Sequence, residues 1–152
     1  MSQVGLKKIF VSALTDVKNT NVDGVGTLRF EGNSIYKFVQ FSGTTAIAAG
    51  DPVYYVLTDK TLGTVDDAHT ALPAGIAVSS IGTLGTQTAL YGWIQLSGIG
   101  TLSNTPSGTL AVGSPLAGST NNGTLAVATT FGSQVVGYSV DGTRTVQLDF
   151  AY

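Results

Sequence analysis

The alternation of apolar and polar positions predicts β-strands along most of the chain, and no segment has the spacing of a convincing helix. In Ser34–Phe41, apolar side chains fall on both faces of an extended segment, Val39 and Phe41 on one face and Tyr36 and Phe38 on the other. A strand with two apolar faces needs cover on both. We therefore expect this strand to lie between two layers.

A second strand is predicted at the end of the chain, where the alternation is cleaner. From Arg144 to Phe150, one face carries Val146, Leu148 and Phe150, and the other carries Thr145, Gln147 and Asp149. A single apolar face is typical of a strand with one side in the core and one in water.

Turn signals separate the β-rich segments at short intervals. Glycine accepts the positive φ angles of tight turns, and Asn-Gly and Asp-Gly pairs favour hairpins. Such signals occur at Glu31-Gly32-Asn33, Gly50-Asp51-Pro52, Asn104–Gly108, Asn121-Asn122-Gly123 and Asp141-Gly142. Many short strands with this punctuation predict an all-β fold, a compact β-barrel or β-sandwich of short antiparallel strands.

The order of these signals occurs twice. Gly50-Asp51-Pro52 is followed by a Gly-Thr segment at 63, a Gly-Ile segment at 75 and the strand Tyr91–Leu96. Gly113-Ser114-Pro115 is followed by the same kinds of segment, ending in Thr145–Leu148. Either two similar β-units pack together, or glycine-rich β sequence matches by chance.

We draw no domain boundary through this echo. We interpret residues 1–152 as a single β-rich domain, in which 1–25 form an extended N-terminal arm and 26–152 the β core.

Charge is sparse, at 11% of residues with a net charge of −2, and Thr70–Val140 contains no Asp, Glu, Lys, Arg or His. Nucleic-acid binding is not expected, because it rests on clustered Lys and Arg. No run approaches the roughly 20 apolar residues that span a bilayer, so no membrane partner is expected. The neutral surface either meets other protein in an assembly or is kept soluble by hydroxyl and amide groups.

Candidate chemistry is equally sparse. The chain has no cysteine and a single histidine, His69, which follows Asp66 and Asp67 in an expected loop. These residues, with Asp59, match no zinc or calcium ligand spacing, and no nucleophile elbow, P-loop or dinucleotide fingerprint occurs. We therefore expect no enzyme activity, no catalytic residues, no metal and no cofactor.

The aromatic residues of Tyr91-Gly92-Trp93 leave three interpretations open. Tyr91 and Trp93 share one face of a strand, and Trp93 is the only tryptophan. The pair can pack in the core, anchor a subunit interface, or form a stacking platform for a sugar.

Four segments together resemble the small virion structural proteins of tailed bacteriophages, above all the capsid decoration (cement) proteins. They are Ile35–Val39, Ala48–Val53 with its Gly-Asp-Pro-Val turn, Gly75–Val78, and Tyr91–Gly98 with its Tyr-Gly-Trp-Ile-Gln strand. The resemblance covers about residues 34–98.

The resemblance implies a non-catalytic protein, made in the host cytoplasm, that binds the outer surface of an icosahedral head and stabilises the capsid. Its partners would be the major capsid protein and itself, as a homo-oligomer, with a trimer favoured over a dimer. In this family an N-terminal arm can reach across capsid subunits. Candidate interface residues are Leu6, Lys7, Ile9 and Phe10 on the arm, and Tyr91 and Trp93 as subunit anchors. The alternative function is a carbohydrate- or receptor-binding β-module of a phage tail or surface protein.

Overall fold

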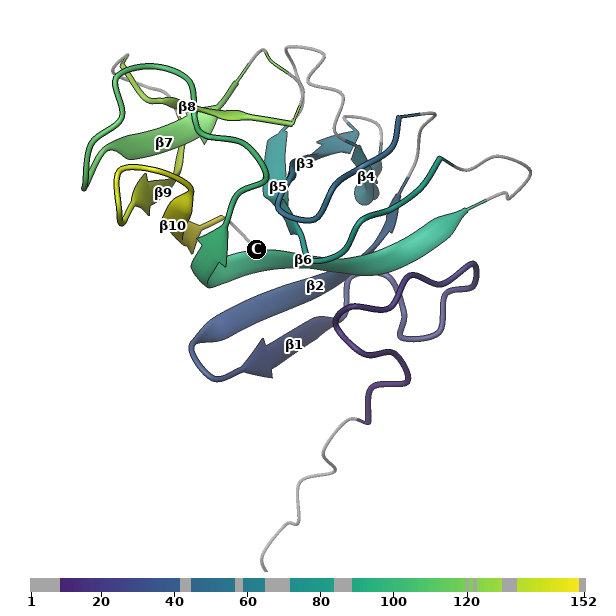
Figure 1. The fold of residues 1–152 in the computed structure, drawn as a ribbon. Coiled ribbons are helices and arrows are strands. Elements are labelled where there is room, and N and C mark those ends of the chain that lie inside the picture. Colours follow the sequence, from purple (N-terminus) through teal and green to yellow (C-terminus); the bar gives the residue numbers. More distant parts are fainter. Residues whose placement is uncertain are drawn as a thin grey trace, which may run out of the picture.

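The computed structural model describes residues 9–41, 45–56, 59–64, 72–83, 89–119, 121, 123–129 and 134–150. Within these ranges every regular element is a strand, and ten strands share one hydrogen-bonded sheet (Figure 1). The strands are β1 (Leu28–Glu31), β2 (Ser34–Phe41), β3 (Pro52–Val56), β4 (Asp59–Thr64), β5 (Leu72–Ala77), β6 (Leu90–Thr101), β7 (Pro115–Gly118), β8 (Leu125–Val127), β9 (Val135–Ser139) and β10 (Thr145–Asp149).

The strands follow the order β1-β2-β4-β3-β5-β6-β10-β9-β7-β8, and β2 also pairs with β6. The β2–β4 pair is parallel, and the other pairs between the described strands are antiparallel. The extra β2–β6 pairing curls β2, β4, β3, β5 and β6 into a ring of neighbours. The predicted all-β fold is confirmed, but the ten-stranded sheet as a whole does not close into a barrel.

The two strands predicted from alternation are confirmed. Strand β2 has the predicted bounds, and Phe38 and Val39, which point to opposite faces, are both fully buried. In β10, Val146 and Leu148 are buried, whereas Gln147 is exposed, as expected for one wet face.

The predicted repeat is present in the strand pairing. In the first unit, β3 pairs with β4 and β5, and β5 pairs with β6. In the second unit, β7 pairs with β8 and β9, and β9 pairs with β10. In the first unit, β2 pairs with the first half of β6, and in the second unit, the second half of β6 pairs with β10. The second half of β6 is therefore the equivalent of β2. We therefore define the first unit as β2–β5 with the first half of β6, and the second unit as the second half of β6 with β7–β10.

The turn that opens each unit repeats in atomic detail. In the first unit, the Gly50 N–H donates to the Ala77 carbonyl at 2.8 Å. In the second, the Gly113 N–H donates to the Ser139 carbonyl, also at 2.8 Å. Both glycines adopt positive φ, 88° and 81°, which favours glycine at these positions. Both units therefore begin with the same turn conformation and the same backbone hydrogen bond.

The pairing of the next two strands repeats as well. Val53 pairs with Gly75, and Leu116 pairs with Gly137, and in both units the register shifts directly afterwards. Chance similarity of glycine-rich sequence does not produce matched registers, matched bulges and matched turns. The echo in the sequence therefore corresponds to two similar β-units.

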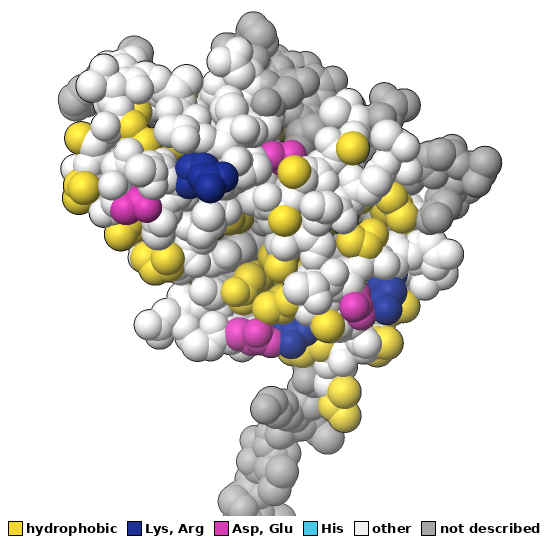
Figure 2. Space-filling view, viewed as in Figure 1, with side chains coloured by type: hydrophobic (Ala, Val, Ile, Leu, Met, Phe, Trp, Pro, Cys, Tyr) yellow, Lys and Arg dark blue, Asp and Glu magenta, His cyan; other side chains and the backbone are white. Residues whose placement is uncertain are grey.

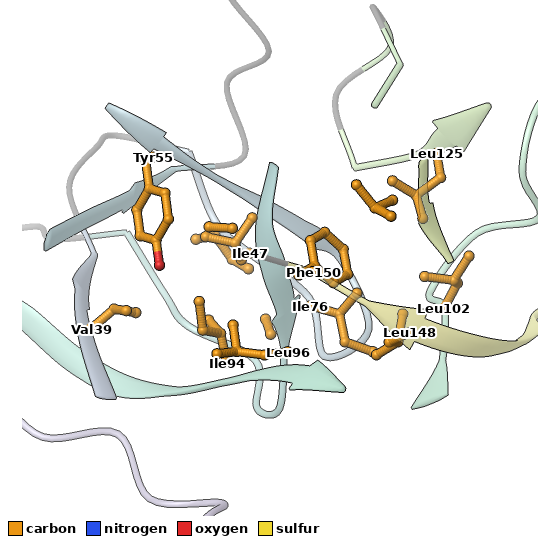
Figure 3. Packing of buried hydrophobic residues seen from close by; sticks show 14 of the residues in the cluster. Val39, Ile47, Tyr55, Ile76, Ile94, Leu96, Leu102, Leu125, Leu148 and Phe150 are labelled. Atoms are coloured by element: carbon orange, nitrogen blue, oxygen red, sulfur yellow. The ribbon is translucent and has the colours of Figure 1, made fainter. Parts of the chain in front are cut away.

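Apolar residues of both units join in one buried cluster (Figure 3). Its members include Val39, Val53 and Ile94 from the first unit and Leu116, Leu125 and Leu148 from the second. All are at most 1% exposed. The continuous cluster ties the two units together through side chains, in addition to the backbone of β6, which runs through both units.

Candidate interaction surface at the N-terminal segment

Residues 9–27, here called the N-terminal segment, lie against the face of β2 and β6 that points away from the core cluster. Lys18 and Tyr91 form an isolated antiparallel bridge, and the Gly26 N–H donates to the Phe38 carbonyl at 2.8 Å. Figure 1 shows this segment beside β1, on the opposite side of the sheet from β7 and β8. The segment supplies the second cover that the two apolar faces of β2 require.

The carboxylate of Asp23 holds the start of this segment in place. It accepts hydrogen bonds from the backbone N–H of Val11 at 2.7 Å and of Ser12 at 3.0 Å, and from the Ser12 hydroxyl. Asp23 and Ser12 are only 7% and 3% exposed. Hydrogen bonds to a charged acceptor are stronger than neutral ones, so this buried contact fixes the path of residues 11 and 12.

Trp93 lies directly beneath the segment. Its indole Nε1 donates to the Ser12 hydroxyl at 2.9 Å, and the Phe10 ring packs edge-on against it with centroids 5.5 Å apart. Phe38 borders the indole from β2 at 5.1 Å. With 2% of its surface exposed, Trp93 offers no open ring face on which a sugar could stack.

Arg29 of β1 lies beside the rings of Phe10 and Trp93. Its guanidinium carbon lies 4.9 Å from the centroid of Phe10 and 5.7 Å from that of Trp93, within the range of cation–π attraction. Its Nη1 also donates to the Ser12 carbonyl at 3.0 Å, and the guanidinium pairs with Glu31. One side chain thus contacts both the segment and the strand below it.

The start of the fixed segment presents two apolar side chains outward. Ile9 is 87% exposed and Val11 is 69% exposed, although both neighbour residues that are held against the sheet. Exposed apolar side chains on an ordered backbone can bury surface against a partner with little loss of conformational entropy. The arrangement is suited to protein contact.

The predicted interface residues have different environments. Leu6 and Lys7 lie outside the described residues. Ile9 is exposed, Phe10 is half-buried on Trp93, and Tyr91 is half-buried and stacked on Phe38 at 6.2 Å. Within this chain, Trp93 is buried by packing, which is one of its three predicted roles. The interface roles of the other candidate residues remain predictions.

Sequence reasoning missed the residues that fix the segment, namely Ser12, Asp23 and Arg29. Asp23 lies in the stretch interpreted as an extended arm, and its carboxylate accepts hydrogen bonds from residues 11 and 12 positions earlier in the chain. The signal in the sequence was an acidic residue in a charge-poor chain, 11 residues after Ser12, which can donate a hydrogen bond to it.

Among the described residues, no group of three or more His, Cys, Asp or Glu gathers. His69, Asp66 and Asp67 lie outside the described residues, as does the side chain of Asp59 in β4. Among the residues that the structure places, no helix is long and apolar enough to cross a membrane.

No family model matches the chain, and no curated protein matches it in sequence. Among solved structures, the chain is similar to the N-terminal base of the head fiber protein gp8.5 of bacteriophage phi29, with 16% identity and a TM-score of 0.48. The similarity covers 76% of this chain and 94% of that one.

Proposed function

We propose that the chain is a structural virion protein that binds the outer surface of an icosahedral phage head as a homo-oligomer and stabilises the capsid. The major capsid protein is the partner in this proposal, and the chain performs no catalysis. The β-segments that resemble decoration proteins supply the class of function. The N-terminal segment supplies a surface that suits it.

The observation that carries the proposal is the fixed, outward-facing apolar start of the N-terminal segment. Asp23, Ser12 and Trp93 hold the backbone, while Ile9 and Val11 project from it. A reinforcing protein needs a contact that does not bend or fray under load. A segment bonded to the sheet meets that need better than a free tail does.

The mechanism is additive burial. Each apolar side chain that passes from water into a contact contributes roughly 1.5–3 kcal/mol when fully buried. A modest contact per copy is multiplied by the symmetry of the shell, so many weak attachments together resist expansion of the head.

Binding to heads of the parent phage that lack this protein tests the proposal. The double variant Ile9→Glu, Val11→Glu places two charges in the proposed contact, and we expect its affinity in a cosedimentation assay to fall by about 100-fold or more. Phe30→Glu is the matched control, because Phe30 is also exposed, at 68%, but lies on β1 outside the segment.

Circular dichroism should be the same for both variants and the wild type. Equal affinity of the double variant and the wild type for heads would refute the role of the segment. Failure of the wild type to bind heads at all would refute the proposed function itself.

A further inference from the structure

The two units present equivalent faces at the edge of their opening turns. Matching the turns and registers gives Tyr36, Ala49, Ile76 and Val78 in the first unit, and Ile99, Val112, Tyr138 and Val140 in the second. We call these sets the first-unit face and the second-unit face. Strand pairing fixes the match. Gln95 pairs with Ile76 and Tyr36 in the first unit, and Gln147 pairs with Tyr138 and Ile99 in the second.

The centre of the first-unit face is covered by the second unit of the same chain, while Tyr36 and Val78 are half-buried and Ala49 is exposed. Residues 101–103 run against Gly50, where an added Cβ would lie 2.6 Å from the Ser103 nitrogen and from the Thr101 oxygen. The Ser103 N–H donates to the Gly50 carbonyl at 3.1 Å. Ile76, at the centre of this face, is 3% exposed. This is an established contact between one unit and its neighbour.

No described residue covers the second-unit face in this way. A Cβ on Gly113, the equivalent of Gly50, would meet no atom within 4 Å. Tyr138, the equivalent of Ile76, is 48% exposed. The other members are also open, with exposed fractions of 56% for Ile99, 73% for Val112 and 42% for Val140.

These exposed side chains are neighbours on one side of the sheet. Gln147 pairs with Tyr138 on β9 and with Ile99 on β6, so the three form a row across the strands. Val140 bonds Thr145 through its N–H, and the turn with Val112 is bonded to β9 through Gly113. Figure 2 shows hydrophobic side chains gathered in this part of the molecule, at the left of the view. The result is a mostly apolar surface, which the exposed Asp141 borders next to Val140.

We infer that a second copy of this chain binds the second-unit face. The inference rests on the homo-oligomer of the proposed function and names the surface through which it forms. The chain already shows that a β-unit of this design packs against a neighbouring β-unit by this face. The second-unit face presents the equivalent residues for the same kind of contact, and no described residue packs on its opening turn at Gly113.

Charge and composition also favour a like partner. A second copy of this chain, in which only 11% of residues are charged, offers mostly neutral surface to this face, whereas a foreign partner is commonly selected by opposite charge. Tyrosine, enriched in interfaces, stands at Tyr138 where the covered unit has an isoleucine. A hydroxyl keeps such a side chain compatible with water until the partner arrives.

Sedimentation equilibrium on the full chain, over a concentration series, tests the inference. The wild type should give a mass that is a multiple of the monomer mass, and Tyr138→Glu should raise the concentration needed for association by at least tenfold. Phe30→Glu, which places the same charge on an equally exposed apolar residue elsewhere, should associate as the wild type does. Circular dichroism of both variants checks that they fold.

A photo-crosslinking amino acid at position 138 gives a readout that does not depend on a disruptive charge. We expect a product of twice the chain mass from position 138 and none from position 30. A wild-type chain that is monomeric at all concentrations, or association that Tyr138→Glu leaves unchanged, would overturn the inference.

Head binding separates this test from that of the proposed function. A Tyr138→Glu chain that is monomeric and still binds heads, more weakly per particle, supports both proposals. A wild type that associates through position 138 but binds no heads supports the second-unit face and refutes the head-binding function.

Discussion

Alanine substitutions at Gly50 and Gly113 isolate the contact between the two units. The glycines occupy equivalent turns with φ of 88° and 81°, so an alanine at either site suffers the same backbone strain. Their surroundings differ. A Cβ at position 50 would lie 2.6 Å from backbone atoms of residues 101 and 103, whereas one at position 113 would meet nothing within 4 Å.

The expected losses follow from these distances. Placing an alanine in the left-handed region costs roughly 1–2 kcal/mol, and this alone is expected for Gly113→Ala. Gly50→Ala also forces two backbone segments apart, and overpacking of this kind costs typically about 1–3 kcal/mol more. The free energy of unfolding should therefore fall by about 2–5 kcal/mol for Gly50→Ala, from the sum of the two effects.

Urea denaturation followed by the fluorescence of Trp93, the only tryptophan, measures both variants with one probe. The protein should be diluted until its mass is that of the monomer, because association would add to the stability. A difference of 1–3 kcal/mol corresponds to a melting temperature lower by roughly 2–12 °C for Gly50→Ala than for Gly113→Ala, in a chain of this size. Equal losses for the two variants would refute the close packing of residues 101–103 on the first unit.

Two further predictions concern acidic residues. Asp23→Asn keeps the size of the side chain but removes the charge that accepts hydrogen bonds from Val11 and Ser12. The free energy of unfolding should fall by about 1.5–3 kcal/mol, and proteolysis of residues 9–22 should become faster. Unchanged proteolysis would show that Asp23 does not hold the segment. Hydrogen bonds from Thr145 and then Thr143 hold the pKa of Asp141 well below its ordinary value of 3.8. Because the folded pKa is the lower one, the stabilisation is present above about pH 4 and is lost as pH falls through the folded pKa. Asp141→Asn should therefore flatten the acid end of the stability–pH curve measured by urea denaturation, and an unaltered curve would count against these hydrogen bonds.

The parts of the fold that depend on local pattern could be predicted from the sequence. Strand β2 and the exposed and buried faces of β10 follow from alternation, and the repeat follows from the order of glycine turns. The cover of the second face of β2 could only be expected in general terms. Which segment provides it depends on contacts such as Trp93 to Ser12, which join residues 81 positions apart and leave no periodic signal.

The same limit applies to the candidate surfaces. A pattern of apolar residues shows that a side chain is suited to burial, but it does not show whether the chain itself supplies the cover. Ile76 and Tyr138 occupy equivalent places, yet one is 3% exposed and the other 48%. The difference accompanies the packing of residues 101–103 on the turn at Gly50, whereas no described residue packs on the equivalent turn at Gly113.

The twelve-residue strand β6 has a consequence for cooperativity. Its first half pairs with β2 and β5, and its second half pairs with β10, so it belongs to both units. Neither unit can lose this strand without breaking the sheet of the other. Amide hydrogens in strands of both units should consequently exchange through one shared opening reaction, and the duplicated architecture should melt in one transition.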